Sequence, residues 1–231
     1  MPSHHHVSAP LARPFDAVLF DCDGVLADSE PTVNGVLRTM IAELGWVLTP
    51  EESMRRFVGR VLEDELPVIM AHAGAVLDAT WIDEFRERRD AALLADGVAP
   101  VEGVVAALDA VVARYPGAVA CASGADRAKI EMQLTMLGIL DRFGGHVLSG
   151  QEQPRSKPAP DVYLAAAASL GVDPRRCAVV EDTVAGTTAG VAAGATVLAY
   201  APEGADADAL RAAGASVVFR AMHELPALVG A

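Results

Sequence analysis

Residues 16–30, DAVLFDCDGVLADSE, place four carboxylates within ten residues, directly after an apolar run. Ala17–Phe20 is short and continuously apolar, a pattern typical of a strand that is buried on both faces. Asp21 and Asp23 would follow the carboxyl end of that strand, which is the edge where open α/β sheets bind ligands. Gly24 permits the tight turn needed there. The segment predicts a buried strand whose end carries a ligand site.

Composition narrows the classes of partner. The formal charge of the 231-residue chain is -13, which argues against nucleic acid or an anionic membrane surface as the main partner. Apolar runs fall short of the roughly 18 residues that a membrane span requires, and residues 1–15 lack a signal peptide's apolar stretch. We expect a cytoplasmic protein that acts on a small metabolite, as a monomer or, alternatively, a homodimer.

Cysteine and histidine usage adds two expectations. The three cysteines, Cys22, Cys121 and Cys177, are an odd number, and each lies in or beside an apolar run, so we expect buried free thiols. The histidine run at residues 4–6 lies near a terminus and is given no role.

The hydrophobic period changes twice along the chain. Residues 33–44 follow helical spacing, with Asp28 or Ser29 as N-cap. Thr49 begins a capping-box motif, and three more helical stretches are expected at 49–59, 61–73 and 81–95. No strand signal interrupts residues 30–98. From Val101 onward, helices alternate with short apolar strands, expected at 118–121, 146–148, 177–180, 196–199 and 216–219.

This order of elements predicts an α/β protein with a doubly wound parallel sheet. One strand precedes the helical block and the other strands follow it. The economical interpretation is a core made of residues 1–28 and 99–231, with an all-helical domain, residues 29–98, inserted after the first strand.

The residues that follow each strand should converge on one crevice. They are Asp21 and Asp23 after the first strand, Ser123 and Gly124 after the second, Glu181 and Asp182 after the fourth, and Lys157 in the segment after the third. Carboxylates beside a hydroxyl, a turn and a lysine suggest Mg2+ holding a phosphoryl group, because this cation prefers carboxylate, water and phosphate oxygens.

Each of these residues also has a structural interpretation. Lys157 is one of only two lysines beside sixteen arginines, which suggests that a compact charge is needed, but it could be a surface residue before a proline-rich turn. Ser123 could be a helix N-cap, and Glu181 and Asp182 could open a helix, where acids favour the dipole.

Four segments resemble, in order and spacing, the four motifs of the haloacid dehalogenase superfamily: DCDGVLADSE, ASG around Ser123, SKPAPD around Lys157, and VEDTVAGTTAG from Val180. The likeness is closest to the branch of β-phosphoglucomutases and sugar-phosphate phosphatases, which carries a helical cap after the first motif.

The resemblance implies a Rossmann-like core and a role for each motif residue. Asp21 would be the nucleophile and Asp23 the general acid and base, a role that needs a raised pKa. Phosphate would be bound by Ser123, Gly124 and Lys157. Mg2+ would be held by Asp21, the carbonyl of Asp23 and Asp182, with Glu181 supporting the metal shell.

The function implied is a Mg2+-dependent phosphatase that acts on a sugar phosphate or a phosphorylated sugar acid such as 6-phosphogluconate, through an aspartyl phosphate. A phosphomutase of the β-phosphoglucomutase type is the alternative, but such enzymes typically place a histidine where this chain has Val33 and Asn34. Gly59 and Arg60 resemble the substrate loop of the cap. Arg60 could pair with a sugar-acid carboxylate or be a solvated cation at a helix end.

Three other kinds of function fit the sequence less well. Cys121 and Arg127 have the Cys-x5-Arg spacing of tyrosine-phosphatase-like enzymes, but that mechanism leaves Asp21, Asp182 and Lys157 without a role. A non-catalytic regulatory or metal-binding module would not need Asp23. A halide-releasing dehalogenase would not need the metal carboxylate Asp182.

Overall fold

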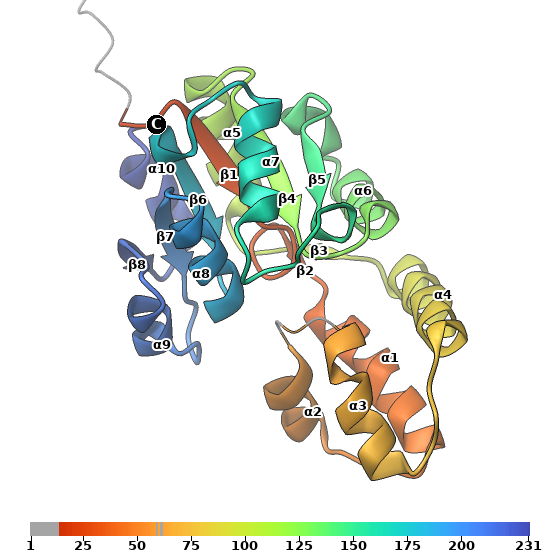
Figure 1. Cartoon of the computed structure of the whole chain (residues 1–231). Helices are drawn as coiled ribbons and strands as arrows, with labels where there is room; N and C mark the ends of the chain where they lie inside the picture. The colour runs from red at the N-terminus through yellow and green to blue at the C-terminus, as the bar shows by residue number, and fades with distance from the viewer. Residues whose placement is uncertain (1–13, 59, 61) are drawn as a thin grey trace, which may run out of the picture.

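The computed structural model describes residues 14–58, 60 and 62–231. The histidine run at residues 4–6 and Gly59 lie outside the described residues. The core is a six-stranded parallel sheet in the order β5-β4-β1-β6-β7-β8, which confirms the predicted α/β class (Figure 1). The strands are β1 (Ala17–Phe20), β4 (Val119–Ser123), β5 (Val147–Ser149), β6 (Cys177–Glu181), β7 (Thr196–Tyr200) and β8 (Val217–Phe219), so all six predicted strands are confirmed.

The central strand β1 is buried on both faces, as its apolar sequence predicts. Val18 and Phe20 join one hydrophobic cluster, whereas Ala17 and Leu19 join the cluster on the opposite face. This alternation follows from the two-residue period of a strand. β1 pairs with β4 on one side and β6 on the other, so the chain order reverses at β1. The carboxyl end of β1 is therefore the switch point where such sheets bind ligands.

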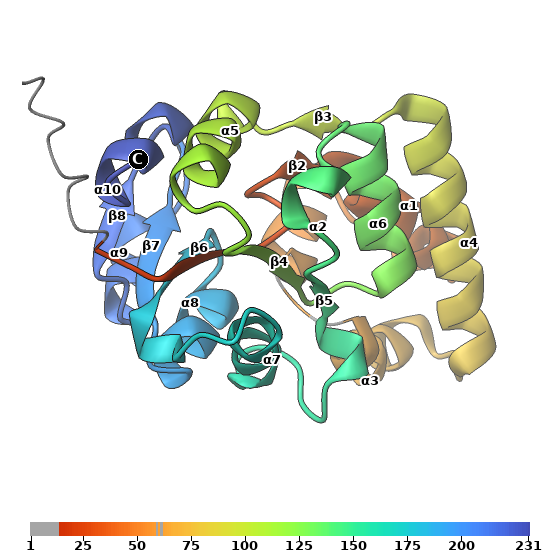
Figure 2. The ribbon, with the colours of Figure 1, turned by 90° about the horizontal axis from the view of Figure 1, so that it is seen from above.

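Helices cover both faces of the sheet (Figure 2). Helices α5 (Val104–Arg114), α6 (Arg127–Met136) and α10 (Leu225–Leu228) pack on one face, and α7 (Asp161–Ser169) and α8 (Val184–Ala192) on the other. Helix α9 (Ala207–Ala212) packs beside β8. Short 3-10 turns lie at η1 (Leu140–Phe143), η2 (Gly150–Glu152), η3 (Pro174–Arg176) and η4 (Met222–Glu224).

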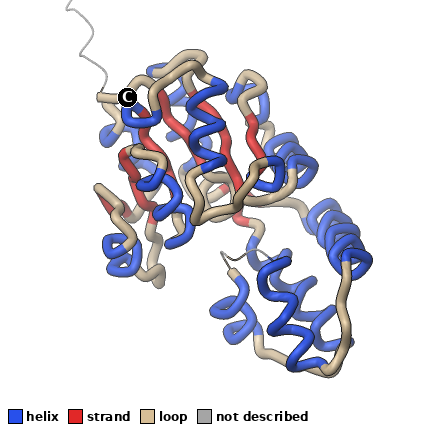
Figure 3. Tube along the Cα trace, viewed as in Figure 1, coloured by secondary structure: helices blue, strands red, loops and turns tan. Residues whose placement is uncertain are grey.

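The inserted segment forms a helical cap, as expected (Figure 3). Its helices are α1 (Glu30–Glu43), α2 (Pro50–Phe57), α3 (Leu62–Ala73) and α4 (Ala79–Asp96), and they share a separate cluster that includes Met40, Ile41 and Ile69. The predicted capping box is present, because the Glu52 amide donates to Thr49 Oγ1 at 3.2 Å and the Thr49 amide donates to Glu52 Oε2 at 2.9 Å. The domain boundaries at residues 28 and 99 stay a prediction.

Two short strands that the sequence did not predict join the cap to the core. β2 (Ala27–Asp28) and β3 (Ala99–Pro100) pair antiparallel where the chain leaves the core and returns to it. Two residues are too few to display a period, so no pattern could reveal them.

One expectation from composition is also met. All three cysteines are free and buried. Within the described residues, no helix combines the length and hydropathy required to cross a membrane.

Gly190 sets the distance between α8 and the sheet. A Cβ at this position would lie 2.7 Å from Val197 Cγ2 and 3.2 Å from Val179 Cγ1, whereas a Cβ at Gly35, in α1, would meet nothing within 4 Å. We predict that Gly35→Ala raises the free energy of unfolding by about 0.5–1 kcal/mol, because alanine favours a helix. Gly190→Ala should lower it by about 1–3 kcal/mol through overpacking. Urea unfolding checks both values, and equal stabilisation of the two variants would contradict this packing.

Candidate active site

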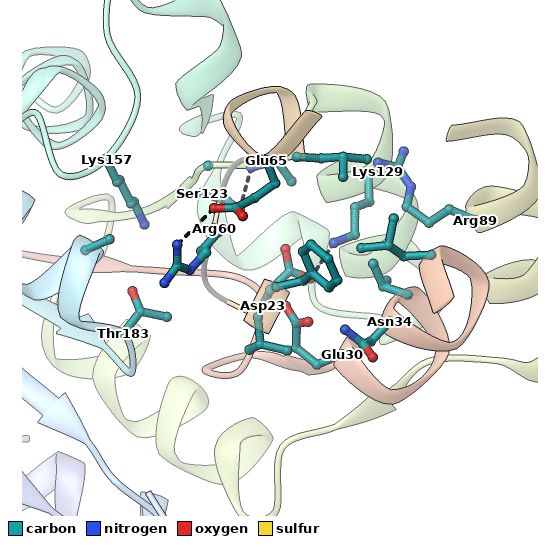
Figure 4. A pocket seen from close by; sticks show the side chains of 18 of the residues that line it. Asp23, Glu30, Asn34, Arg60, Glu65, Arg89, Ser123, Lys129, Lys157 and Thr183 are labelled. Carbon is teal, nitrogen blue, oxygen red and sulfur yellow. Dashed lines mark hydrogen bonds and ion pairs between the residues drawn. The ribbon is translucent and has the colours of Figure 1, made fainter. Parts of the chain in front are cut away.

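The residues that follow β1, β4 and β6 converge on one cavity between the core and the cap, as predicted (Figure 4). The cavity contains every predicted site residue within the described part of the chain: Asp21, Asp23, Arg60, Ser123, Gly124, Lys157, Glu181 and Asp182. Gly59 lies outside that part. The roles assigned to these residues stay predictions.

Lys157 is at the centre of the core side of this cavity. Its ammonium donates to Asp21 Oδ1 at 2.8 Å, Glu181 Oε1 at 2.7 Å and the Tyr163 hydroxyl at 2.9 Å, and lies 3.2 Å from the Ala122 carbonyl. Its side chain is only 9% exposed, so the interpretation of Lys157 as a surface residue is wrong. Burial disfavours the ammonium, but Asp21 and Glu181 hold the pKa of Lys157 well above its ordinary value.

Glu181 fixes the position of Lys157 and of the loop after β6. Its side chain is fully buried, and Oε2 accepts hydrogen bonds from the Asp182 amide, the Thr183 amide and Thr183 Oγ1, each at 2.9 Å. Burial would raise the pKa of Glu181, but Lys157, the Thr183 amide and the Tyr163 hydroxyl lower it. A Cβ at Gly186 would lie 1.6 Å from Glu181 Oε1, so this carboxylate needs the glycine of α8. Since both oxygens are occupied, Glu181 suits a supporting role better than direct metal ligation.

Asp21 and Asp182 are the acids of this cavity that are available to bind a cation. Carboxylate oxygens of Asp21, Glu181 and Asp182 all lie within 4.8 Å of one another. Asp182 Oδ1 is buried and has no hydrogen-bond partner among the described residues. Burial raises the pKa of Asp21 to about 7, and burial with the charges of Glu181 and Asp21 raises the pKa of Asp182 well above its usual range. A hard divalent cation suits carboxylate oxygens that lie this close together.

Asp23 lies outside this group of acids. Its Oδ1 accepts from Ser29 Oγ at 2.6 Å, Lys129 Nζ at 2.8 Å and Gln133 Nε2 at 3.0 Å. Burial alone would raise the pKa of Asp23, but attraction to Lys129 and these three hydrogen bonds lower it to about 2. The expected raised pKa is therefore wrong for this structure.

Lys129 is a site residue that the sequence analysis missed. It is buried in α6, and it is one of the chain's two lysines, both of which contact an aspartate of the first motif. The scarcity of lysine in the chain is a signal for Lys129 as much as for Lys157.

The cap contacts the core beside Lys129. Arg89 of α4 places Nη1 2.9 Å from Asp126 Oδ2, and Asp126 Oδ1 accepts from the Lys129 amide at 2.9 Å as the N-cap of α6. The helix position of Lys129 and the placement of the cap are thus joined through one carboxylate.

Asp126 caps α6, so the interpretation of Ser123 as a helix N-cap is wrong. Thr183 caps α8, and Glu181 and Asp182 directly precede that cap, so their interpretation as acids at a helix start stays open beside the site role. Ser123 is buried, and its Oγ accepts from the Ala125 amide at 3.2 Å.

Arg60 lies in the cavity and pairs with Glu65 Oε1 at 2.9 Å, with a side chain that is 60% exposed. Its role as an anion receptor stays a prediction.

The alternative cysteine-based phosphatase site is not formed. Cys121 is fully buried within β4. The Arg127 guanidinium donates to Glu152 Oε1 at 2.6 Å and to the Val147 carbonyl at 2.7 Å, so it closes no loop around the Cys121 thiol.

Replacing Glu181 tests the buried network without reference to function. We predict that Glu181→Gln lowers the free energy of unfolding by about 3–5 kcal/mol, because it leaves Lys157 without one of its buried partners. The folded-state pKa of Glu181 is lowered, so its stabilisation is present above the unfolded pKa and is lost as pH falls through the folded value. The difference between wild type and variant in urea, with chelator, should shrink at acidic pH.

The matched control is Glu152→Gln. Glu152 forms an exposed ion pair with Arg127, so its replacement should change the free energy of unfolding by less than about 1 kcal/mol. A Glu181→Gln variant as stable as this control would contradict the network.

Comparison with known proteins places the chain in a family. Residues 15–194 match the model of haloacid dehalogenase-like hydrolases. The chain is 31% identical to 6-phosphogluconate phosphatase of Escherichia coli K12 over 80% of its own length and 82% of that protein. It is 32% identical to hexitol phosphatase B of the same organism, over 77% of this chain and 79% of that one.

A solved structure agrees with the fold. A haloacid dehalogenase family hydrolase of Deinococcus radiodurans, with bound phosphate and sodium, superposes with a TM-score of 0.74 at 35% identity, covering 94% of this chain and 96% of that one. Together with the cavity at the switch point and the four converging motifs, these matches show that the chain belongs to the haloacid dehalogenase-like hydrolases and is a phosphatase.

Proposed function

We propose that this phosphatase is Mg2+-dependent, that it hydrolyses a small phosphorylated metabolite of the sugar-phosphate or sugar-acid phosphate class, and that it forms an aspartyl phosphate on Asp21. The observation that carries the proposal is the placement of Asp21 at the end of β1, held by Lys157 and close to Asp182. A nucleophilic carboxylate splits one difficult displacement into two easier ones.

The core side of the cavity suits a phosphoryl group. Ser123 is the last residue of β4 and Gly124 follows it, and Lys157 supplies positive charge beside Asp21. Asp21 and Asp182 would hold Mg2+, with Glu181 supporting them, in agreement with the unpartnered Asp182 Oδ1. When bound, the cation supplies charge stabilisation for the phosphoryl oxygens and offsets the repulsion among these acids.

The reaction balances with the two aspartates. Asp21 forms a bond to phosphorus as the bond from phosphorus to the leaving oxygen breaks, and Asp23 gives its proton to that oxygen. Asp23 then takes a proton from water, whose oxygen attacks phosphorus and releases Asp21 and inorganic phosphate. The low pKa of Asp23 keeps its carboxylate ionised, which is the form that the second step requires. Proton donation in the first step requires the Lys129 contact to weaken when substrate enters.

A phosphomutase is less well supported. The first turns of α1 place Val33 and Asn34 at the cavity, and neither side chain can shuttle a proton as histidine does. We further propose a cytoplasmic enzyme, monomeric or homodimeric, that binds neither nucleic acid nor membrane.

Replacing Asp21 tests the nucleophile. Phosphate release from a panel of phosphorylated sugars, sugar acids and nucleotides should depend on Mg2+ and stop with chelator. Asp21→Asn should reduce kcat by at least about 10^3-fold while the thermal unfolding transition remains cooperative. Cys121→Ser is the control and should change kcat less than about twofold, because the thiol is buried away from the reacting atoms. The reverse pattern would reject the aspartyl mechanism.

Replacing Lys129 tests how Asp23 is held. Lys129→Met should lower kcat by about 10–100-fold, since general acid–base catalysis depends on a placed and correctly charged group. With Lys129 gone the burial of Asp23 remains, so its pKa should rise. Because Asp23 must be protonated to donate to the leaving oxygen, the alkaline limb of the kcat/KM profile should move to higher pH.

Lys129→Arg keeps the charge and is expected to return the alkaline limb close to its wild-type position. An unchanged pH profile in Lys129→Met would show that Lys129 does not act on Asp23.

A further inference from the structure

The cap side of the cavity faces the part of the substrate that leaves. Asp23 is the proposed proton donor to the leaving oxygen, so residues beyond Asp23, away from Lys157, meet the carbon skeleton. Figure 4 shows Glu30 and Asn34 on that side, across the view from Lys157. The apolar wall there consists of Val33, Leu37, Phe57, Ile82 and Phe85.

The positive charges of the cavity are already paired. Five basic residues line it within the described part of the chain, against seven acidic ones. Each basic group has a carboxylate oxygen within 2.9 Å: Lys157 with Asp21, Lys129 with Asp23, Arg60 with Glu65, Arg86 with Glu63, and Arg89 with Asp126. A second anionic group on a substrate would therefore compete with a carboxylate for each of these cations.

Glu30 and Asn34 differ from these paired groups. They lie one turn apart on α1, and neither side chain has a hydrogen-bond partner among the described residues. Asn34 is only 4% exposed, but its amide is not among the buried side-chain atoms that lack a partner, so the surface it keeps opens onto the cavity. A ligand in the cavity can therefore replace water as the hydrogen-bond partner of this amide.

Hydroxyl groups match both side chains. A hydroxyl can donate to the Glu30 carboxylate, and it can both accept from and donate to the Asn34 amide. A carboxylate on the substrate can only accept hydrogen bonds, and the negative charge of Glu30 would repel it. The aromatic and aliphatic wall suits the C–H faces of a carbon chain.

We propose that the cap side of the cavity binds a neutral, hydroxylated carbon chain through Glu30 and Asn34, so that the enzyme prefers a sugar or polyol phosphate to a phosphorylated sugar acid. This inference rests on the proposed function and narrows its substrate class. It assigns Arg60 to its pair with Glu65 and not to a substrate carboxylate.

Two compounds test the preference directly. Glucitol 6-phosphate and 6-phosphogluconate have the same six-carbon open chain and the same phosphate, and they differ only at C1, which is an alcohol in one and a carboxylate in the other. Burial and the charge of Asp23 raise the pKa of Glu30 to about 7, so the assay is made at about pH 8, where this carboxylate is mostly ionised. We expect kcat/KM for the alcohol to be at least about 10-fold higher there, because the carboxylate of the acid meets the negative charge of Glu30. Equal values, or a preference for the acid, would overturn the inference.

Variants identify the groups responsible. Glu30→Gln should lower the ratio of the two kcat/KM values toward one, since it removes the repelling charge. Glu87→Gln, an exposed acid on α4 outside the cavity lining, makes the same charge change and should leave the ratio at the wild-type value. Glu65→Gln frees Arg60 and should raise kcat/KM for the acid. An unchanged ratio in Glu30→Gln would show that Glu30 does not determine the substrate preference.

Calorimetric binding separates this inference from the proposed function. Absence of phosphate release from every compound with Mg2+ would reject the proposed function. The dissociation constants of the same two compounds for Asp21→Asn, measured with Mg2+, test the preference without turnover. The alcohol should bind at least about 10-fold more tightly. Equal binding, or no binding of either compound, would overturn the inference.

Discussion

The buried ammonium of Lys157 joins the parts of the site. It contacts Asp21 after β1, the Ala122 carbonyl in β4, Glu181 at the end of β6, and Tyr163 of α7. Three strand ends and one helix are thus connected by a single positive charge. Acids buried so near one another would repel without it, and a buried ion pair is worth forming only when its remaining bonding capacity is also satisfied. The Glu181 carboxylate meets that condition, because backbone amides and a hydroxyl occupy its second oxygen.

The two aspartates of the first motif acquire different chemistry from different lysines. Asp21 shares Lys157 with Glu181 and lies near Asp182, and burial raises its pKa to about 7. Asp23 has Lys129 and two further donors, which bring its pKa to about 2 despite burial. A nucleophile has to be ionised and a general acid protonated, so the roles proposed for Asp21 and Asp23 need both pKa values to move when cation and substrate bind. A cation held by Asp21 and Asp182 would lower the pKa of Asp21. The cap shares in this arrangement because Arg89 contacts the residue that caps the helix of Lys129.

The sequence predicted features in which one local signal was strong. The strand at Ala17–Phe20 is continuously apolar and proved buried on both faces, and Thr49 with Glu52 formed the expected capping box. The site also converged as predicted, because parallel strands bring their carboxyl ends to one edge.

Other features depend on contacts between distant segments. Asp23 and Lys129 are 106 residues apart, so the lowered pKa of Asp23 could not be foreseen from its neighbours in the chain. The two-residue strands β2 and β3 carry no period. Glu30 was given no role beyond its place in the first motif, and only the structure shows that its side chain lines the cavity without a hydrogen-bond partner among the described residues.

The central claim is that a phosphoryl group passes through Asp21, and chemical trapping tests it most directly. Enzyme mixed with substrate and Mg2+ would be acid-quenched within a turnover and treated with borohydride, which reduces an acyl phosphate to the alcohol. Peptide mass mapping should then find homoserine in place of Asp21 in the substrate-treated sample and aspartate in the sample without substrate. Unmodified Asp21 throughout, with the label at another residue or at none during active turnover, would contradict the account.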